Sequence, residues 1–249
     1  MPVWLEAGFW GLVAGGALVV GAAVAWLVKV PHVVVAGVLA FGSGVLISTL
    51  AFDLVDEAET SGGLGPTAIG LLAGAATYVA ANVWLGRRGA ARRKNMGEMQ
   101  MSEEKMSGSG TALAVGALLD GVPESVVLGM TLLGGGGVGV PVLAAIFISN
   151  LPEGLSSAAG MKANGRSPRY VFGVWGGIAV ASGLAGMCGA LFLEGAAPET
   201  VAVITAVAAG AILAMVADTM IPEAFERAHL YSGLICTLGF ISAFAISRG

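Results

Sequence analysis

Apolar residues fill most of the chain in long continuous blocks, which charged, polar or Gly/Pro-rich clusters interrupt. Each block is close to the length of about 20 residues that an α-helix needs to cross a bilayer. The blocks predict eight transmembrane helices, over residues 7–28, 33–55, 65–86, 111–133, 139–161, 170–193, 199–221 and 230–247. The expected fold is therefore all-α, a single polytopic membrane domain that takes in residues 1–249.

The composition agrees with a membrane protein and excludes other classes. Of the 249 residues, 56% are hydrophobic and 11% are charged, whereas an ordinary soluble domain has about 25% charged residues. Glycine supplies 40 residues without a Gly-X-Y period, which excludes collagen. Small residues let membrane helices approach closely, and their spacing is compatible both with packing inside one chain and with a homodimer.

The basic residues predict the orientation of the helices. Eleven of the 12 Lys and Arg residues lie in the connections after the first, third, fifth and seventh predicted helices. Because Lys and Arg gather on the cytoplasmic side, we expect both termini outside a plasma (inner) membrane. The longest such connection, residues 87–110, is the predicted cytoplasmic loop. Its basic cluster is balanced by Glu98, Glu103 and Glu104, so the loop does not indicate nucleic-acid binding.

Four acidic residues inside the predicted helices are the candidates for function: Asp53, Asp120, Glu124 and Glu153. Each acid costs about 2.5–3.5 kcal/mol at the centre of a membrane helix, so four together cost on the order of 10 kcal/mol. No Lys or Arg lies at comparable depth in any predicted helix. The counter-charge is therefore expected from protons, water or a bound cation.

The spacing of polar residues around these acids favours the cation. Asp120 and Glu124 are four residues apart, so they project from one face of a helix. Ser149 and Glu153 repeat this spacing on the next helix, and Asn150 precedes Glu153 by three residues. The two helices are thus expected to contribute the two halves of one oxygen-lined site. The alternative is a pair of structural kinks whose protonated carboxyl groups bond to Ser or Asn.

A proline stands directly before each of the two glutamates, at Pro123 and Pro152. Proline has no N–H group, so the carbonyl groups of Leu119 and Ile148 lose their partners within the helix. These carbonyl oxygens are further candidates to bind water or a cation.

A short internal repeat joins the second predicted helix to the seventh. Residues 51–58 read AFDLVDEA and residues 217–224 read ADTMIPEA, and the two helices cross the membrane in opposite directions. This predicts inverted repeats in a 3+2+3 arrangement, with the fourth and fifth helices in the middle, as in transporters that bind substrate near the midplane. Asp218, Glu223, Glu226 and His229 then lie at the cytoplasmic mouth, as an exit relay or as a solvated helix end.

With these features the chain resembles the Zrt/Irt-like (ZIP) metal-ion transporters, as a divergent, bacterial-type member. The resemblance rests on the helix layout, the basic loop and the segments 53–58, 120–125, 149–154 and 221–224. It implies that Glu124 and Glu153 are bridging metal ligands and that Asp120, Ser149 and Asn150 take the neighbouring ligand positions. It also implies that Asp53 stands where many members have a histidine in the second helix.

The chain lacks the family's usual intramembrane histidines, because His32 and His229 fall at the ends of predicted helices. The candidate ligands are therefore oxygens, which zinc accepts and which Mn, Fe(II) and Mg suit better. We expect uptake of a divalent cation, zinc on the resemblance, as a transported substrate and without a bound cofactor.

Two further readings remain beside metal uptake. The same acids would also serve a proton-coupled carrier or channel for a non-metal solute. An enzyme is not expected, because no motif such as His-Glu-x-x-His is present.

Overall fold

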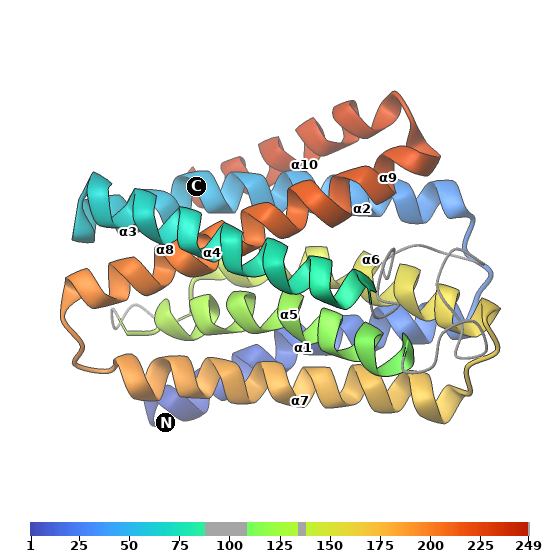
Figure 1. Ribbon diagram of the computed structural model, residues 1–249, viewed down its shortest axis with the longest axis horizontal. Helices are drawn as coiled ribbons and strands as arrows, with labels where there is room; N and C mark the ends of the chain where they lie inside the picture. Colours follow the sequence, from blue (N-terminus) through green and yellow to red (C-terminus); the bar gives the residue numbers. More distant parts are fainter. Residues whose placement is uncertain (88–108, 134–137, 249) are drawn as a thin grey trace.

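Long helices lie roughly along one axis in the computed structural model (Figure 1). The structure describes residues 1–87, 109–133 and 138–248, so residues 88–108 of the predicted loop lie outside it. Within these ranges the chain forms helices and connections and no strand, which confirms the all-α prediction. Seven of the helices are long and apolar enough to cross a membrane.

The elements follow one another in three groups. The first group is α1 (Val3–Leu27), α2 (His32–Thr49), the π-helical segment η1 (Leu50–Leu54), α3 (Val55–Gly62) and α4 (Leu64–Leu85). The second group is α5 (Ser109–Met130) and α6 (Val140–Ala163). The third group is α7 (Pro168–Leu193), α8 (Pro198–Met215), the π-helical segment η3 (Val216–Met220), α9 (Ile221–Ala228) and α10 (Tyr231–Arg248). The seven membrane-length helices belong to the first and third groups and to α6, and the 22-residue α5 runs through the same bundle.

The second and seventh helices are longer in the structure than predicted from the sequence. They were predicted to end at residues 55 and 221, but the helical path continues through η1 and α3 to Gly62, and through η3 and α9 to Ala228. The predicted ends are the ends of apolar blocks, and a helix need not end there. Charged residues such as Glu57 and Glu226 have a good helix propensity, so the helix continues through them. The connections predicted at these places are therefore partly helical.

The internal repeat of the sequence is also a repeat of structure. The segments α2–η1–α3 and α8–η3–α9 each consist of 18 α-helical, five π-helical and eight α-helical residues. Their boundaries coincide in the register that aligns Ala51 with Ala217, so that Asp53 corresponds to Thr219. The two segments run in opposite directions along the bundle (Figure 1).

Each repeated segment packs against one neighbouring helix through glycines. Helix α2 packs against α10, and α8 packs against α4. In each pair two glycines face backbone carbonyl groups of the other helix, so closely that a Cβ atom would collide with them. The contacts are Gly44 with Cys236 and Gly239 with Phe41 for α2 and α10, and Gly210 with Leu71 and Gly74 with Val207 for α8 and α4. The contact residues on α2 and α8 correspond in the register of the repeat, and those on α4 and α10 are offset from it by one residue. Small residues therefore stabilise both pairs in a similar way.

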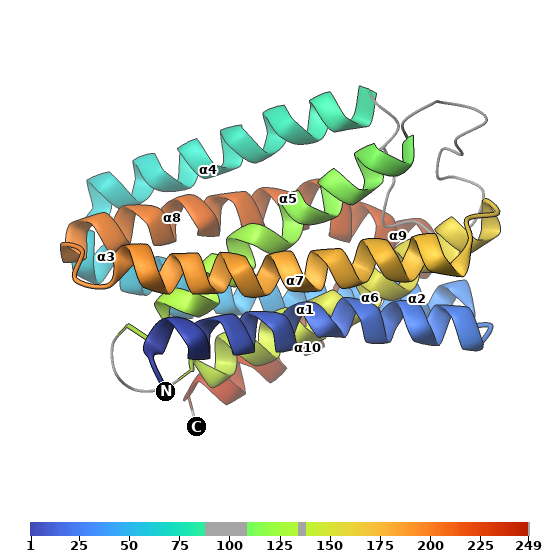
Figure 2. The same cartoon turned by 90° about the horizontal axis from the view of Figure 1, so that it is seen from below.

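Both termini lie at the same end of the bundle, here called the terminal end (Figure 1). The opposite end, here called the basic end, holds the connections at residues 28–31, 164–167 and 229–230. Helices α4 and α10 lie on the outside and are the least buried of the seven membrane-length helices, whereas most of α6 is buried. Figure 2 shows α4 at the margin and α5 crossing obliquely beneath it. Helices α5 and α6 are thus enclosed by the first and third groups.

Candidate metal centre

Three of the four predicted acids are buried in the two central helices. Asp120 and Glu124 on α5 are 3% and 1% exposed, and Glu153 on α6 is 4% exposed. The helices continue through Pro123 and Pro152, so the i, i+4 spacing places the paired residues on one face as predicted. Burial of three carboxyl groups in helices of this kind demands a compensating proton, donor or cation.

Ser149 and Asn150 are buried next to Glu153, and their hydrogen-bond donors are used by backbone carbonyl groups. Ser149 is 1% exposed, and its hydroxyl donates to Ile146 O at 3.0 Å. Asn150 is 4% exposed, and its Nδ2 donates to Ala14 O of α1 at 3.0 Å. The same holds on α5, where the Ser125 hydroxyl donates to Gly121 O at 2.8 Å. The two hydroxyl protons and one N–H of the Asn150 amide are thus used, and the oxygens of these side chains keep lone pairs that suit a cation.

Asp120 has a partner that no sequence pattern predicts. The hydroxyl of Tyr78, on α4, donates to Oδ1 of Asp120 at 2.8 Å. Tyr78 is 1% exposed and lies about two turns inside the C-terminal end of α4, whereas membrane tyrosines usually reach water at helix ends. A tyrosine inside an apolar helix is thus a signal that could have indicated a buried hydrogen-bond acceptor.

Close helix contacts fix the central helices on both sides. A Cβ on Gly42 of α2 would lie 3.3 Å from the Cα of Ser149. Gly154 of α6 faces the carbonyl of Leu18 on α1, so closely that a side chain would collide with it. Helix α5 in turn packs against α7, where Ser182 lies 3.4 Å from the Cβ position of Gly121. The predicted ligands therefore stand on a rigid frame that α1, α2, α4 and α7 supply.

Asp53, the fourth predicted acid, lies apart from this frame, towards the terminal end. It belongs to η1 and is partly buried, and Oδ1 accepts a hydrogen bond of 2.7 Å from the Ser247 hydroxyl near the end of α10. Its other oxygen, Oδ2, is buried and has no hydrogen-bond partner among the described residues. Asp53 also lines a cavity of about 440 Å³ together with Asp56 and Glu57. The structure thus places it in an acidic mouth.

The acids at the other repeated segment differ from Asp53 in their surroundings. Asp218 in η3 is exposed, and Glu223 in α9 is buried at 9% exposure. Thr219, which corresponds to Asp53, is 7% exposed and donates to Met215 O at 2.7 Å. His229 ends α9 with a positive φ of 47° and is exposed. The relay predicted here therefore has one buried member, Glu223, one partly buried member, Glu226, and two exposed ones.

Among residues 1–87, 109–133 and 138–248, no three His, Cys, Asp or Glu side chains lie close enough to hold a metal ion. The two histidines are exposed at helix ends, as the sequence predicts. A cation between α5 and α6 would therefore draw on the hydroxyl and amide oxygens of Ser149 and Asn150 besides carboxylates. Neither the protein-family models nor the curated proteins compared with the chain match it.

Proposed function

We propose that the protein carries a divalent metal cation inward across a membrane, through a site that α5 and α6 share. The observation that carries the proposal is the burial of Asp120, Glu124 and Glu153, each at most 4% exposed. The two helices have no Lys or Arg at the same depth as these acids. A membrane protein retains such costly groups where they bind an ion or move protons. The proposed function is that of a transporter in a lipid bilayer and not that of an enzyme.

The proposed ligands are Glu124 and Glu153, completed by Asp120, Ser149 and Asn150. The Ser149 hydroxyl and one N–H of Asn150 donate to backbone carbonyls, and the side-chain oxygens of all five residues are available as acceptors. All these ligands are oxygens, and this observation supports Mn, Fe(II) or Mg beside zinc, which rests on the resemblance to the ZIP family.

The proposed topology has eight transmembrane helices in a 3+2+3 arrangement, with both termini outside. Two features support it. The repeated segments run in opposite directions, and both termini lie at the same end, as an even number of crossings requires. The basic end carries Lys29 and Arg166 in its connections, Lys162 in the last turn of α6 and Arg169 in the first turn of α7, which favours that end as the cytoplasmic one.

In the proposed mechanism one group of helices rocks against the other around the central acids, and opens the site to each side in turn. The acidic cavity at Asp53 concentrates cations at the outer mouth. Metal ions bind deprotonated carboxylates, so each loading step releases protons and each unloading step takes them up.

The test is uptake by purified protein in proteoliposomes, across Zn, Cd, Mn, Fe(II), Co and Mg. Glu124→Gln and Glu153→Gln keep the side-chain volume and remove the charge, and Glu199→Gln, an exposed acid of α8, is the matched control. Loss of groups outside the first ligand shell costs metal sites about 10–100-fold, so each central variant should lose at least about tenfold in uptake. The control should match the parent protein.

Full uptake by the double variant Glu124→Gln/Glu153→Gln would overturn the proposal. Metal-insensitive proton flux in the parent protein, with no uptake of any of the six metals, would instead assign the acids to a proton-coupled carrier or channel. The rank order of the metals decides between zinc and a harder cation.

A further inference from the structure

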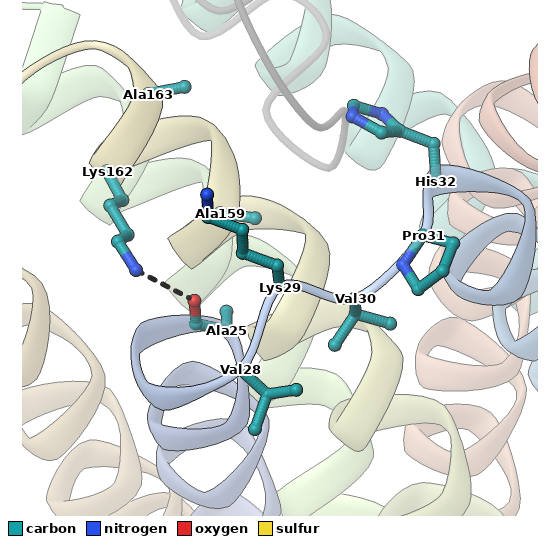
Figure 3. A pocket seen from close by; sticks show the side chains of 9 residues that line it. All are labelled: Ala25, Val28, Lys29, Val30, Pro31, His32, Ala159, Lys162 and Ala163. Carbon is teal, nitrogen blue, oxygen red and sulfur yellow. Dashed lines mark hydrogen bonds between the residues drawn. The ribbon is translucent and has the colours of Figure 1, made fainter.

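A cavity at the basic end holds three nitrogen-bearing side chains. It measures about 460 Å³, within the range of about 300–1,000 Å³ of small-ligand sites. Lys29 lines it from the connection between α1 and α2, His32 from the start of α2, and Lys162 from the last turn of α6 (Figure 3). The described residues that line it include no Asp or Glu. The cavity is thus cationic and has no acid of its own to neutralise it.

Lys162 is held in place by the end of α1. Its Nζ donates to Trp26 O at 2.7 Å and lies 3.5 Å from Ala25 O, the contact drawn in Figure 3. Nζ also lies 5.2 Å from the centroid of the Trp26 ring. Carbonyl groups at a helix C-terminus favour a cation, but they do not cancel its charge. Lys162 is therefore a fixed positive charge at the rim of the cavity.

Lys29 and His32 are not engaged in this way. In the described ranges neither side chain has a hydrogen bond or an ion pair, and both are exposed. Helix α2 begins at His32 without a side-chain cap, so the N–H groups of its first turn add partial positive charge beside these side chains. A pair of uncommitted basic side chains next to a fixed lysine is suited to a phosphate group.

The surroundings of the cavity belong to the edge of a bilayer. Trp26 packs edge to face on Phe172 of α7, as aromatic residues do at the level of lipid headgroups. The neighbouring apolar side chains Leu27, Val28 and Val33 are 82%, 56% and 63% exposed. Exposed apolar surface directly beside a cationic cavity matches a molecule with an anionic head and acyl chains, rather than a fully hydrated anion.

We infer that this cavity, lined by Lys29, His32 and Lys162, binds the phosphate headgroup of an anionic phospholipid. The lipid would join the connection of α1 and α2 to the end of α6, while its chains lie along the exposed residues Leu27 and Val33. The inference is independent of the proposed transport, because none of these residues belongs to the candidate metal centre.

The test is native mass spectrometry of the purified full chain in detergent, titrated with phosphatidylglycerol or with phosphatidylcholine of the same acyl chains. The variants are Lys29→Gln, which removes a pocket charge, and Lys29→Arg, which keeps it. Arg169→Gln is the matched control, because Arg169 is exposed at the same end, in the first turn of α7, but does not line the cavity.

Phosphatidylglycerol should bind more tightly than phosphatidylcholine to the parent protein. One Lys near an anionic lipid surface contributes about 1 kcal/mol, so Lys29→Gln should weaken phosphatidylglycerol binding about fivefold. Lys29→Arg and Arg169→Gln should bind it as the parent does. Equal affinity for the two lipids, or equal losses in Lys29→Gln and Arg169→Gln, would overturn the inference. Displacement of the lipid by an equal concentration of inorganic phosphate would assign the cavity to free phosphate instead of a lipid.

Discussion

The contact between Tyr78 and Asp120 gives the sharpest prediction for stability. It joins α4, on the outside of the bundle, to α5 in the centre. The two side chains are 1% and 3% exposed, and the phenol oxygen lies 2.8 Å from Oδ1. A hydrogen bond to a charged group contributes about 1.5–3 kcal/mol to the free energy of unfolding. Removal of the phenol hydroxyl takes this hydrogen bond away from a buried carboxyl oxygen of Asp120. Tyr78→Phe should therefore lower the free energy of unfolding by about 1.5–3 kcal/mol.

Thermal unfolding of the purified protein in one detergent measures this effect. At this chain length 1 kcal/mol shifts Tm by about 2–4 °C, so the predicted loss is roughly 3–12 °C. Tyr231→Phe is the matched control, because Tyr231 is 72% exposed and its hydroxyl should contribute less than about 0.5 kcal/mol.

A double-mutant cycle with Asp120→Ala separates this hydrogen bond from the other contacts of Tyr78. In the Asp120→Ala background, Tyr78→Phe should cost much less than it does in the parent protein. An equal cost in both backgrounds would refute the reasoning, since Tyr78 would then stabilise the fold without acting through Asp120.

Two further predictions concern the repeat and the outer mouth. Gly44→Ala and Gly210→Ala should each destabilise the protein by about 1–3 kcal/mol, because each new Cβ would meet a carbonyl of the neighbouring helix. Gly16→Ala, with nothing within 4 Å of its Cβ position, should instead stabilise by about 0.5–1 kcal/mol, and a loss of stability there would contradict the packing argument. Asp53→Asn should raise the KM of metal uptake severalfold with a smaller effect on the maximal rate, because Asp53 lines the mouth rather than the centre. Ser247→Ala, which removes a hydrogen bond to Asp53 but keeps the carboxylate, should leave KM closer to that of the parent, and the kinetics of the two variants check this.

The sequence predicts the helices and the buried acids well because both depend on local information. An apolar block of about 20 residues determines a membrane-length helix, and an acid within such a block is conspicuous because it is costly. The burial of Asp120, Glu124, Ser149, Asn150 and Glu153 agrees with this reasoning. The partners of these residues are not local. The bond of Tyr78 to Asp120 joins residues 42 positions apart, and that of Asn150 to Ala14 joins residues 136 positions apart. No pattern along a single helix carries such pairings, which depend on how the helices pack.

The two π-helical segments share their fold but differ in their chemistry. The sequence match aligned residues 51–58 with 217–224 and so gave the register of the repeat, but a π-helical turn leaves no mark on hydrophobic periodicity over five residues. Such segments often occur at functional sites. In η1 the repeated position is Asp53, whose carboxylate lines an acidic cavity, whereas in η3 it is Thr219, whose hydroxyl proton is taken by the carbonyl of Met215. The fold therefore repeats while the charge at this position does not, although the acid Glu57 corresponds to the acid Glu223 in the same register. In the proposed transport this difference adds one negative charge to the outer mouth, which favours the approach of cations from that side.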